Sequence, residues 1–260
     1  MEKIGEILRV HNLSAGYDAI FKIKNISFSL YEGDFLAILG KNGSGKTTLL
    51  KAILGFVPKV AGEVIVEGKS VSSLSQKKIA KIISYVPQMN FTPFPFTVKE
   101  IVEMGRYPYK GRFEKNSDET VFEAMEITKV LDFKDRKILE LSSGEIQRVF
   151  IAKALAQDTP IIFLDEPSSH LDINFQIEVY EILEELVKKK KKTLLVTEHN
   201  LNLASLYSKK ILFLVEGKIF KNGKVSEMLE RENIKKVYDA EVKILKESPD
   251  SPPLIFPEKR

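Results

Sequence analysis

The stretch GKNGSGKT, residues 40 to 47, restricts what this chain can fold into more than any other part of its sequence. It consists of a glycine, four further residues and then Gly-Lys-Thr. The apolar run DFLAILG (34–40) leads into it, and a helical pattern follows from Lys46 to Leu54. A buried strand, a glycine-rich turn and a helix in this order are the context of a phosphate-binding loop. The sequence therefore predicts an α/β core with this loop at the end of a strand.

The composition of the loop supports the same chemistry. Its glycines let the backbone turn tightly enough for successive N–H groups to face phosphate oxygens, and the helix adds its positive N-terminal end. Lys46 is expected to bind the β- and γ-phosphates of a nucleotide, and Thr47 to offer its hydroxyl to Mg²⁺. A glycine-rich turn with a surface lysine is the alternative interpretation, which the flanking strand and helix disfavour.

A pair of carboxylates follows a second apolar run. In IIFLDEP (161–167), four apolar residues precede Asp165 and Glu166, and open α/β sheets bind ligands at such carboxyl ends of strands. Asp165 is the expected partner of Mg²⁺, as a Walker B aspartate. Glu166 is expected to polarise the attacking water as general base. A lone Asp-Glu pair is usually a helix-capping turn, but its combination with the phosphate-binding loop favours a hydrolytic site.

The three histidines differ in their positions. His199 ends the strand-like run TLLVTEH, and it is a candidate to contact the γ-phosphate and to hold the attacking water with Glu166. His11 lies in an N-terminal strand pattern, where a structural role is the better hypothesis. His170, in SSHLD, is a candidate loop residue near a dimer contact.

Composition excludes several function classes. Because none of the 260 residues is cysteine, disulfides, cysteine zinc sites and thiol nucleophiles are excluded. The N-terminus MEKIGEILRV has no secretory pattern, and apolar runs such as ILFLV are far shorter than the roughly 20 residues of a membrane span. We therefore expect a soluble chain. The net charge is only +4, and the lysine run 188–192 is interpreted as a solvated helix end, not as a nucleic-acid surface.

The order of patterns along the chain predicts one α/β domain over residues 1–240, with a helical subdomain inserted at about 88–158. Within that insertion MNFTPFPFT (89–97) is too rich in proline and phenylalanine to be a regular element, and helical patterns follow at about 98–105, 118–131 and 145–157. The runs KILFLVEG and KIFKNG predict a hairpin. Residues 241–260 contain SPDSPP and are predicted to be a loosely attached extension, which either packs on the core or remains mobile.

Six motifs together resemble those of one family. GKNGSGKT, YVPQ, LSSGEIQR, IIFLDEP, SSHLD and TEH occur in the order and spacing of the ATP-binding-cassette (ABC) ATPases, and the resemblance covers about residues 5 to 235. It implies a P-loop NTPase core of α/β class, with an N-terminal antiparallel β subdomain and an inserted α-helical subdomain. It also implies hydrolysis of ATP to ADP and phosphate, with Mg²⁺.

The resemblance assigns further residues to the site. Tyr17 matches the aromatic residue that stacks on adenine, and Gln88 matches the Q-loop glutamine, a contact of Mg²⁺ and water that also senses the membrane partner. The catalytic set is then Glu166, His199 and Gln88, and the metal set is Thr47, Gln88 and Asp165. The residues implied to hold the phosphates are Gly40, Asn42, Gly43, Ser44, Gly45, Lys46, Thr47 and Thr48.

The stretch LSSGE (141–145) resembles the family's signature motif, usually LSGGQ or LSGGE. In ABC ATPases two cassettes pair head to tail, and the signature of one closes over ATP held by the other. Ser142, Gly144 and Glu145 are thus implied to bind the nucleotide in trans, and Asp172 to lie at the dimer interface. Ser143 departs from the pattern, where glycine is usual, and would be unfavourable if that position needed a positive φ.

The wording of two segments resembles one branch of the family. TVKEIVEMGRYPY (97–109) and EHNLNLA (198–204) look like importers of iron chelates (siderophore or haem) and cobalamin. This likeness implies a second copy of the chain, transmembrane permease subunits docking near residues 89–113, a substrate-binding protein acting indirectly, and a cytoplasmic location on the inner face of the cell membrane. The alternative is a non-transport ABC ATPase of ribosome or DNA complexes. A nucleotide kinase would have no use for the signature turn.

Overall fold

The computed structural model describes residues 5–17, 20–88, 94–109, 117–248 and 251–259. The chain divides into two compact units, Met1–Leu74 with Thr193–Arg260, and Ser75–Lys192. Within the described residues, no helix is both long and apolar enough to cross a membrane.

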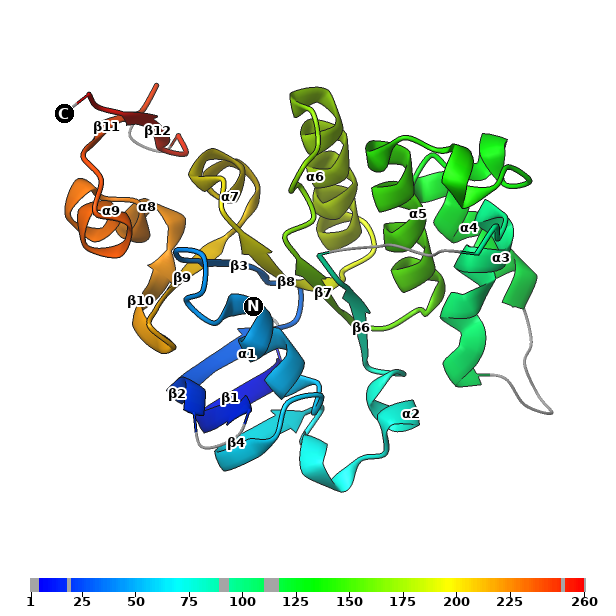
Figure 1. Ribbon diagram of the computed structural model, residues 1–260, viewed down its shortest axis with the longest axis horizontal. Coiled ribbons are helices and arrows are strands. Elements are labelled where there is room, and N and C mark those ends of the chain that lie inside the picture. The colour runs from blue at the N-terminus through cyan, green and yellow to red at the C-terminus, as the bar shows by residue number, and fades with distance from the viewer. Residues whose placement is uncertain (1–4, 18–19, 89–93, 110–116, 249–250, 260) are drawn as a thin grey trace. The chain divides into compact units, whose positions relative to one another are not determined.

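The first unit begins with an antiparallel sheet whose strands lie in the order β2-β1-β4-β5 (Figure 1). Leu8, Val10 and Leu13 of its strand β1 are buried, as expected where one face of a sheet covers a core. The strands are β1 (Glu6–Tyr17), β2 (Ile20–Tyr31), β4 (Lys59–Val66) and β5 (Lys69–Ser70). This sheet confirms the predicted N-terminal antiparallel β subdomain.

The first unit also contains a mostly parallel sheet in the order β10-β9-β3-β8. Strand β3 (Phe35–Leu39) pairs in parallel with β8 (Thr193–Glu198) on one side and β9 (Lys210–Val215) on the other. Every residue of β3 is buried, which matches its continuous apolar sequence. The predicted hairpin is present as β9 and β10 (Lys218–Lys224). Helices α1 (Lys46–Ile53) and α7 (Leu201–Tyr207) follow β3 and β8.

The C-terminal residues form structure that the sequence did not predict. Asn202 of α7 binds both backbone groups of Ile255, donating to its carbonyl at 3.1 Å and accepting from its N–H at 2.7 Å. The Ile255 side chain is buried in the same cluster as Phe213 of β9. The extension therefore packs on its unit. Helices α8 (Val225–Met228) and α9 (Arg231–Tyr238) follow β10, and the extension itself contains strands β11 (Val242–Leu245) and β12 (Leu254–Pro257).

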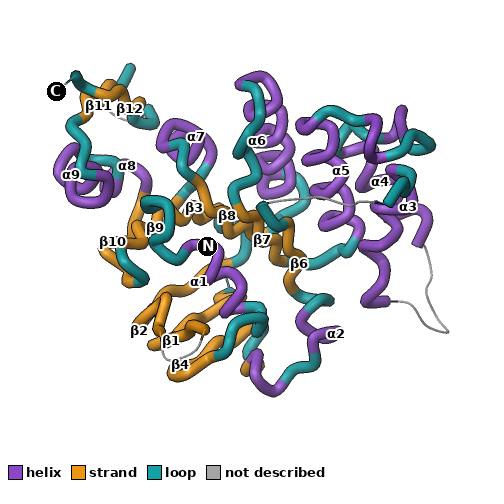
Figure 2. The backbone as a smooth tube through the Cα atoms, in the orientation of Figure 1, coloured by secondary structure: helices purple, strands orange, loops and turns teal. Residues whose placement is uncertain are grey.

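The second unit combines two parallel strands, β6 (Ile83–Val86) and β7 (Ile161–Asp165), with most of the helices around them. Figure 2 shows α3, α4 and α5 side by side, and they contact one another. The predicted helix at 118–131 ends earlier, because Lys129 has a positive φ of 56° and stops the helical backbone. The helices are α2 (Gln76–Ile79), α3 (Val98–Glu103), α4 (Ser117–Ile127), α5 (Ser143–Ala156) and α6 (Ile173–Lys188).

Candidate functional site

The phosphate-binding loop connects β3 to α1, as predicted. Gly45 precedes α1 with a φ of 105°, and Gly43 has a φ of 78°. A side chain at Gly45 would be strained, since other L residues rarely adopt this conformation. No side chain caps the N-terminus of α1, so this helix end is available to an external acceptor. Phosphate oxygens are acceptors of that kind.

The Lys46 ammonium group lies at the mouth of this loop. Its Nζ donates to the Gly40 carbonyl at 2.9 Å and to the Lys41 carbonyl at 3.4 Å. It also lies 3.2 Å from Nε2 of His199, and an ammonium group can only donate in such a contact. The structure thus brings together two residues that are 153 positions apart, both of which the sequence marked as γ-phosphate contacts.

The buried hydroxyl of Ser44 tests whether the loop fits a phosphate. Its Oγ is among the few buried side-chain atoms of the described residues that have no hydrogen-bond partner. A buried donor without a partner costs about 1–3 kcal/mol, and a phosphate oxygen is a suitable acceptor for it. Together with the Lys46 ammonium and the uncapped helix, this hydroxyl fits a polyphosphate.

Two further residues of the first unit bear on this site. Tyr17 is the last residue of β1, and it is 50% exposed, so its ring is accessible for stacking on a base. Asn200 follows His199 and caps α7, with its Oδ1 accepting from the N–H groups of Asn202 and Leu203. This cap sets where the helix begins directly after the histidine.

The carboxylates of the second unit lie at the end of β7. Asp165 is 1% exposed, and the Tyr85 hydroxyl donates to its Oδ2 at 3.2 Å. Burial and the neighbouring Asp165 carboxylate raise the pKa of Tyr85, so the phenol stays protonated and remains a donor. Tyr85 was not among the predicted site residues. It lies in β6, directly before Val86, and β6 pairs in parallel with β7.

Glu166 and Gln88, predicted separately as general base and Q-loop residue, are in contact. Nε2 of Gln88 donates to Oε2 of Glu166 at 2.5 Å. Glu166 has a φ of 51°, a conformation that costs about 1–3 kcal/mol for a residue other than glycine. Such strain persists where the surrounding contacts compensate for it, and functional sites are where it gathers.

The signature turn begins α5 at Ser143, two residues earlier than the helical pattern predicted. Ser142 is its N-cap, and Glu145 completes a capping box: the Ser142 N–H donates to Oε2 of Glu145 at 2.8 Å, and the hydroxyl does so at 2.8 Å. These two bonds lower the pKa of Glu145. Ser143 is the first helical residue and is not among the residues with positive φ. The suspected strain at this departure from glycine is therefore absent.

The other sequence candidates have the following positions. Asp172 is the N-cap residue of α6, exposed, and its side chain makes no capping bond. His170 is exposed in the preceding turn, with a φ of 62°. His11 lies in β1 with its ring exposed, 3.3 Å from Nδ2 of Asn12.

The segment predicted to bind a permease is described only for residues 94–109; residues 89–93 and 110–113 lie outside the described residues. Phe94 and Tyr107 are 61% and 68% exposed. Arg106, by contrast, is 8% exposed: it donates to the Ala156 carbonyl at 2.9 Å and lies over the Tyr109 ring. Arg106 lies within the segment 89–113 expected to meet the permease, but it offers little surface to a partner because its guanidinium makes contacts within its own unit.

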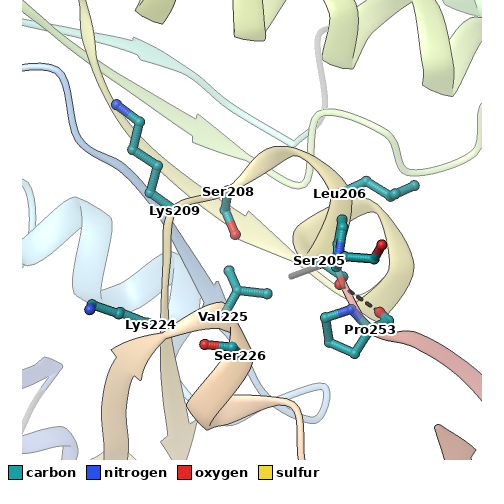
Figure 3. A pocket seen from close by; sticks show the side chains of 10 residues that line it. Ser205, Leu206, Ser208, Lys209, Lys224, Val225, Ser226 and Pro253 are labelled. Atoms are coloured by element: carbon teal, nitrogen blue, oxygen red, sulfur yellow. Dashed lines mark hydrogen bonds between the residues drawn. The ribbon is translucent and has the colours of Figure 1, made fainter. Parts of the chain in front are cut away.

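A pocket of about 380 Å³ in the first unit is lined by no residue of the phosphate-binding loop. Figure 3 shows Lys209 and Lys224 extending away from Ser205 and Pro253, which are joined by a hydrogen bond. The Lys209 ammonium donates instead to the Gly33 carbonyl at 2.8 Å. The pocket is therefore a gap beneath the docked C-terminal segment and no part of the site.

Comparison with known proteins gives one family throughout. The ABC transporter profile matches residues 23–169. The petrobactin import ATP-binding protein YclP of Bacillus subtilis is 34% identical over 92% of this chain and 95% of its own length, and the ferric enterobactin transport ATP-binding protein FepC of Escherichia coli is 36% identical over 96% and 93%. The uncharacterized ABC transporter ATP-binding protein YvrA of Bacillus subtilis is 39% identical over 97% of this chain, which spans 58% of YvrA.

Solved structures agree with this result. A transporter described as of metal-chelate type, in an inward-facing conformation, matches with a TM-score of 0.84 and 28% identity over 98% of both chains. A dimeric ATP-binding cassette with ADP and phosphate bound matches with a TM-score of 0.74 and 29% identity, over 84% of this chain and 98% of the other. With the phosphate-binding loop and the sheet order described above, these matches show that this chain belongs to the ABC transporter family and is an ABC-type ATPase.

Proposed function

We propose that this chain is the ATP-hydrolysing subunit of an importer that takes up an iron chelate or a related compound through a separate permease. The observation that carries the proposal is the nearly end-to-end match with YclP and FepC, both named for siderophore transport. The matches cover 92% and 96% of this chain. This supports the iron-chelate branch over ABC ATPases in general.

ATP is the substrate, and the phosphate-binding loop is proposed to hold its phosphates. Lys46 contributes charge, the Ser44 hydroxyl and the N-terminus of α1 contribute donors, and Tyr17 stacks on the adenine. When the nucleotide enters, its γ-phosphate offers Lys46 a stronger partner than the Gly40 carbonyl it now binds. His199, beside that ammonium, then contacts the same phosphate.

Mg²⁺ is proposed to be held by Thr47, Gln88 and Asp165. A hydroxyl, an amide oxygen and a carboxylate are the hard oxygen donors that this ion prefers, so the residue types fit. When bound, the ion neutralises charge on the transferred phosphoryl group. The bond that the Tyr85 hydroxyl donates orients the Asp165 carboxylate.

Glu166 is proposed to accept a proton from the attacking water as general base. Its carboxylate is held by Gln88, which restricts the direction from which it can take that proton. Once ATP is hydrolysed, it would no longer hold the two subunits together. Because Gln88 directly precedes the segment proposed to meet the permease, this contact is a route by which the partner can influence the base.

A second copy of the chain is proposed to complete the site. Ser142, Gly144 and Glu145 would bind the partner's nucleotide, with Asp172 at the interface. Ser142 and Ser143 are exposed at the beginning of α5, which supports a role in binding from outside. The dimeric cassette with ADP and phosphate is a precedent within the family.

The permease is proposed to dock on the segment around residues 94–109, through exposed aromatic side chains such as Phe94 and Tyr107. The chain would then lie on the cytoplasmic face of the membrane, and a substrate-binding protein would act through the permease. None of the relatives reported above is a ribosome- or DNA-associated ATPase. We therefore do not favour the non-transport alternative.

Co-purification tests this proposal. The tagged chain is isolated from gently solubilised membranes of its host, in parallel with a Phe94→Ala/Tyr107→Ala variant. We expect a multi-span permease with the unmodified chain and clearly less with the variant, while ATP hydrolysis by the two isolated proteins is equal. Ribosomal or DNA-bound partners without a membrane protein would refute the transport role and leave the ATPase intact. Uptake of ferric siderophores and cobalamin by vesicles containing the complex then separates the substrates.

A further inference from the structure

Gly144 of the signature turn is in close contact with the side chain of Phe175. A Cβ atom at Gly144 would lie 2.6 Å from Cγ, 2.7 Å from Cδ1 and 3.0 Å from Cβ of Phe175. Real Cβ atoms essentially never come within 3.0 Å of such carbon atoms, so this close approach favours glycine. Gly144 lies in the first turn of α5 and is not among the glycines with positive φ. Its requirement is thus one of space, not of backbone conformation.

The direction of that Cβ matters for the nucleotide. An alanine methyl at Gly144 would point into α6, toward Phe175. Ser142 and Ser143, by contrast, are exposed and Gly144 is buried. The surface that is open to a second subunit is therefore formed by the serines, while the missing side chain of Gly144 faces the interior of its own subunit.

The first helical turns of α6, which contain Phe175, also hold in place the loop that precedes the helix, residues 168–172. Nε2 of Gln176 donates to the Leu171 carbonyl at 3.0 Å and to the Ser168 carbonyl at 3.3 Å. One turn further, Glu178 forms an ion pair with Arg148 of α5 at 3.1 Å. Phe175 and Glu178 are three residues apart and lie on one face of α6. That face contacts the signature helix, while Gln176 holds the turn that contains Asp172.

We propose that Phe175 and Gln176 are positioning residues that join the signature turn and the 168–172 turn into one unit, and that Gly144 must be glycine because of Phe175 and not because of the nucleotide. This inference rests on the proposed role of both turns at the ATP-bridged dimer interface. Its consequence is that a change at one turn is transmitted to the other through the first turns of α6. The two turns then approach a partner's ATP together.

A rescue experiment tests the inference. All variants are made in Glu166→Gln, and ATP-dependent dimerisation, ATP binding and melting temperature are measured. Gly144→Ala is expected to weaken dimerisation roughly tenfold or more, because it overpacks the contact with Phe175. Gly144→Ala/Phe175→Ala removes the two closest ring atoms and is expected to recover most of the loss, although Phe175→Ala alone is itself weakened by its cavity. ATP binding is measured at protein concentrations too low for dimerisation, so that a loss of dimerisation is distinguished from a loss of nucleotide affinity at the phosphate-binding loop.

Gln176→Leu tests the other half of the unit, with Glu181→Ala as the control because Glu181 is exposed on the same helix. We expect weaker dimerisation for Gln176→Leu and none of this effect for Glu181→Ala, with equal ATP binding. If the double variant dimerises no better than Gly144→Ala, the nucleotide requires the glycine and the inference is wrong. If the double variant recovers its melting temperature but not its dimerisation, Phe175 contributes only to packing and the proposed positioning role is wrong. Failure of the unaltered Glu166→Gln protein to dimerise would instead contradict the proposed dimer, and the melting temperatures would still test the Phe175 contact.

Discussion

The chain has two helix N-termini with the chemistry to meet a phosphate group, and they are built in opposite ways. At α1 the preceding Gly45 is in the left-handed region, no side chain caps the helix, and the buried Ser44 hydroxyl has no partner. At α5, Ser142 and Glu145 cap the helix reciprocally and the backbone is helical from Ser143 onward. The first end is left open for a ligand, whereas the second is satisfied before any ligand arrives.

This difference matches the two proposed roles. An open end gains when a polyphosphate fills it, because the buried Ser44 hydroxyl then finds an acceptor. A helix N-terminus that is capped by its own side chains keeps its conformation in the free subunit. It can therefore bind a second molecule without rearranging. On this proposal, the same type of element would serve binding within one chain or contact between chains, according to whether its own side chains cap it.

The largest effect is expected from Lys46→Ala, which removes the charge from the open end. ATP binding should be strongly weakened and hydrolysis should fall by roughly 100-fold or more, since the ammonium group faces the charge that develops on the phosphates. Calorimetric ATP titration and phosphate release measure the two effects. Lys59→Ala, on exposed β4, is the control for loss of a positive charge. Normal ATP affinity in Lys46→Ala would mean that the open end does not hold the phosphates.

Glu166→Gln separates the binding roles of the two helix N-termini from the hydrolysis step. The variant should bind ATP, hydrolyse it roughly 100- to 10,000-fold more slowly, and accumulate as a dimer, because neither helix end is altered. Size-exclusion chromatography with and without ATP, together with a hydrolysis assay, measures this. Hydrolysis at the unmodified rate would show that Glu166 is not the general base.

Ser143→Gly tests the closed end, where the sequence departs from its family. Because Ser143 already has a helical backbone without positive φ, glycine brings no relief of strain, and we expect the ATPase rate to change less than about tenfold. A steady-state assay at saturating ATP is sufficient. A larger change would mean that the serine side chain itself acts on the partner's nucleotide.

The smallest effect concerns pH and the capping box. The bonds from Ser142 lower the pKa of Glu145, so their stabilisation is fully present above the carboxyl's ordinary pKa of about 4.3 and is lost as the pH falls through the lowered value. Glu145→Gln should therefore melt at a slightly lower temperature than the unmodified chain at neutral pH, and the gap should close in acid. Melting curves from pH 7 to pH 3 measure it. A gap that does not change with pH would exclude the carboxylate as its cause.

The sequence by itself determined what neighbouring residues can specify. GKNGSGKT predicted its loop, strand and helix because glycine freedom, apolar runs and helical periodicity are local properties. The same holds for the end of β7 at Asp165 and for the hairpin β9–β10. The start of α5 is also specified by neighbouring residues, because Ser142 and Glu145 have the spacing of a capping box. The periodic pattern placed the start of the helix slightly later.

Only the tertiary structure decided which distant residues meet. The contacts of Lys46 with His199 and of Gln88 with Glu166 depend on how parallel strands are ordered in a sheet, which no local pattern encodes. The C-terminal extension looked loose because it is rich in proline and serine, yet Asn202 binds both backbone groups of Ile255. From the sequence alone the glycine at position 144 would be explained by phosphate binding, whereas in the structure Phe175 occupies the space of its missing side chain. The physical reason is common to these cases: packing and hydrogen bonding act between atoms that are close in space, whatever their distance along the chain.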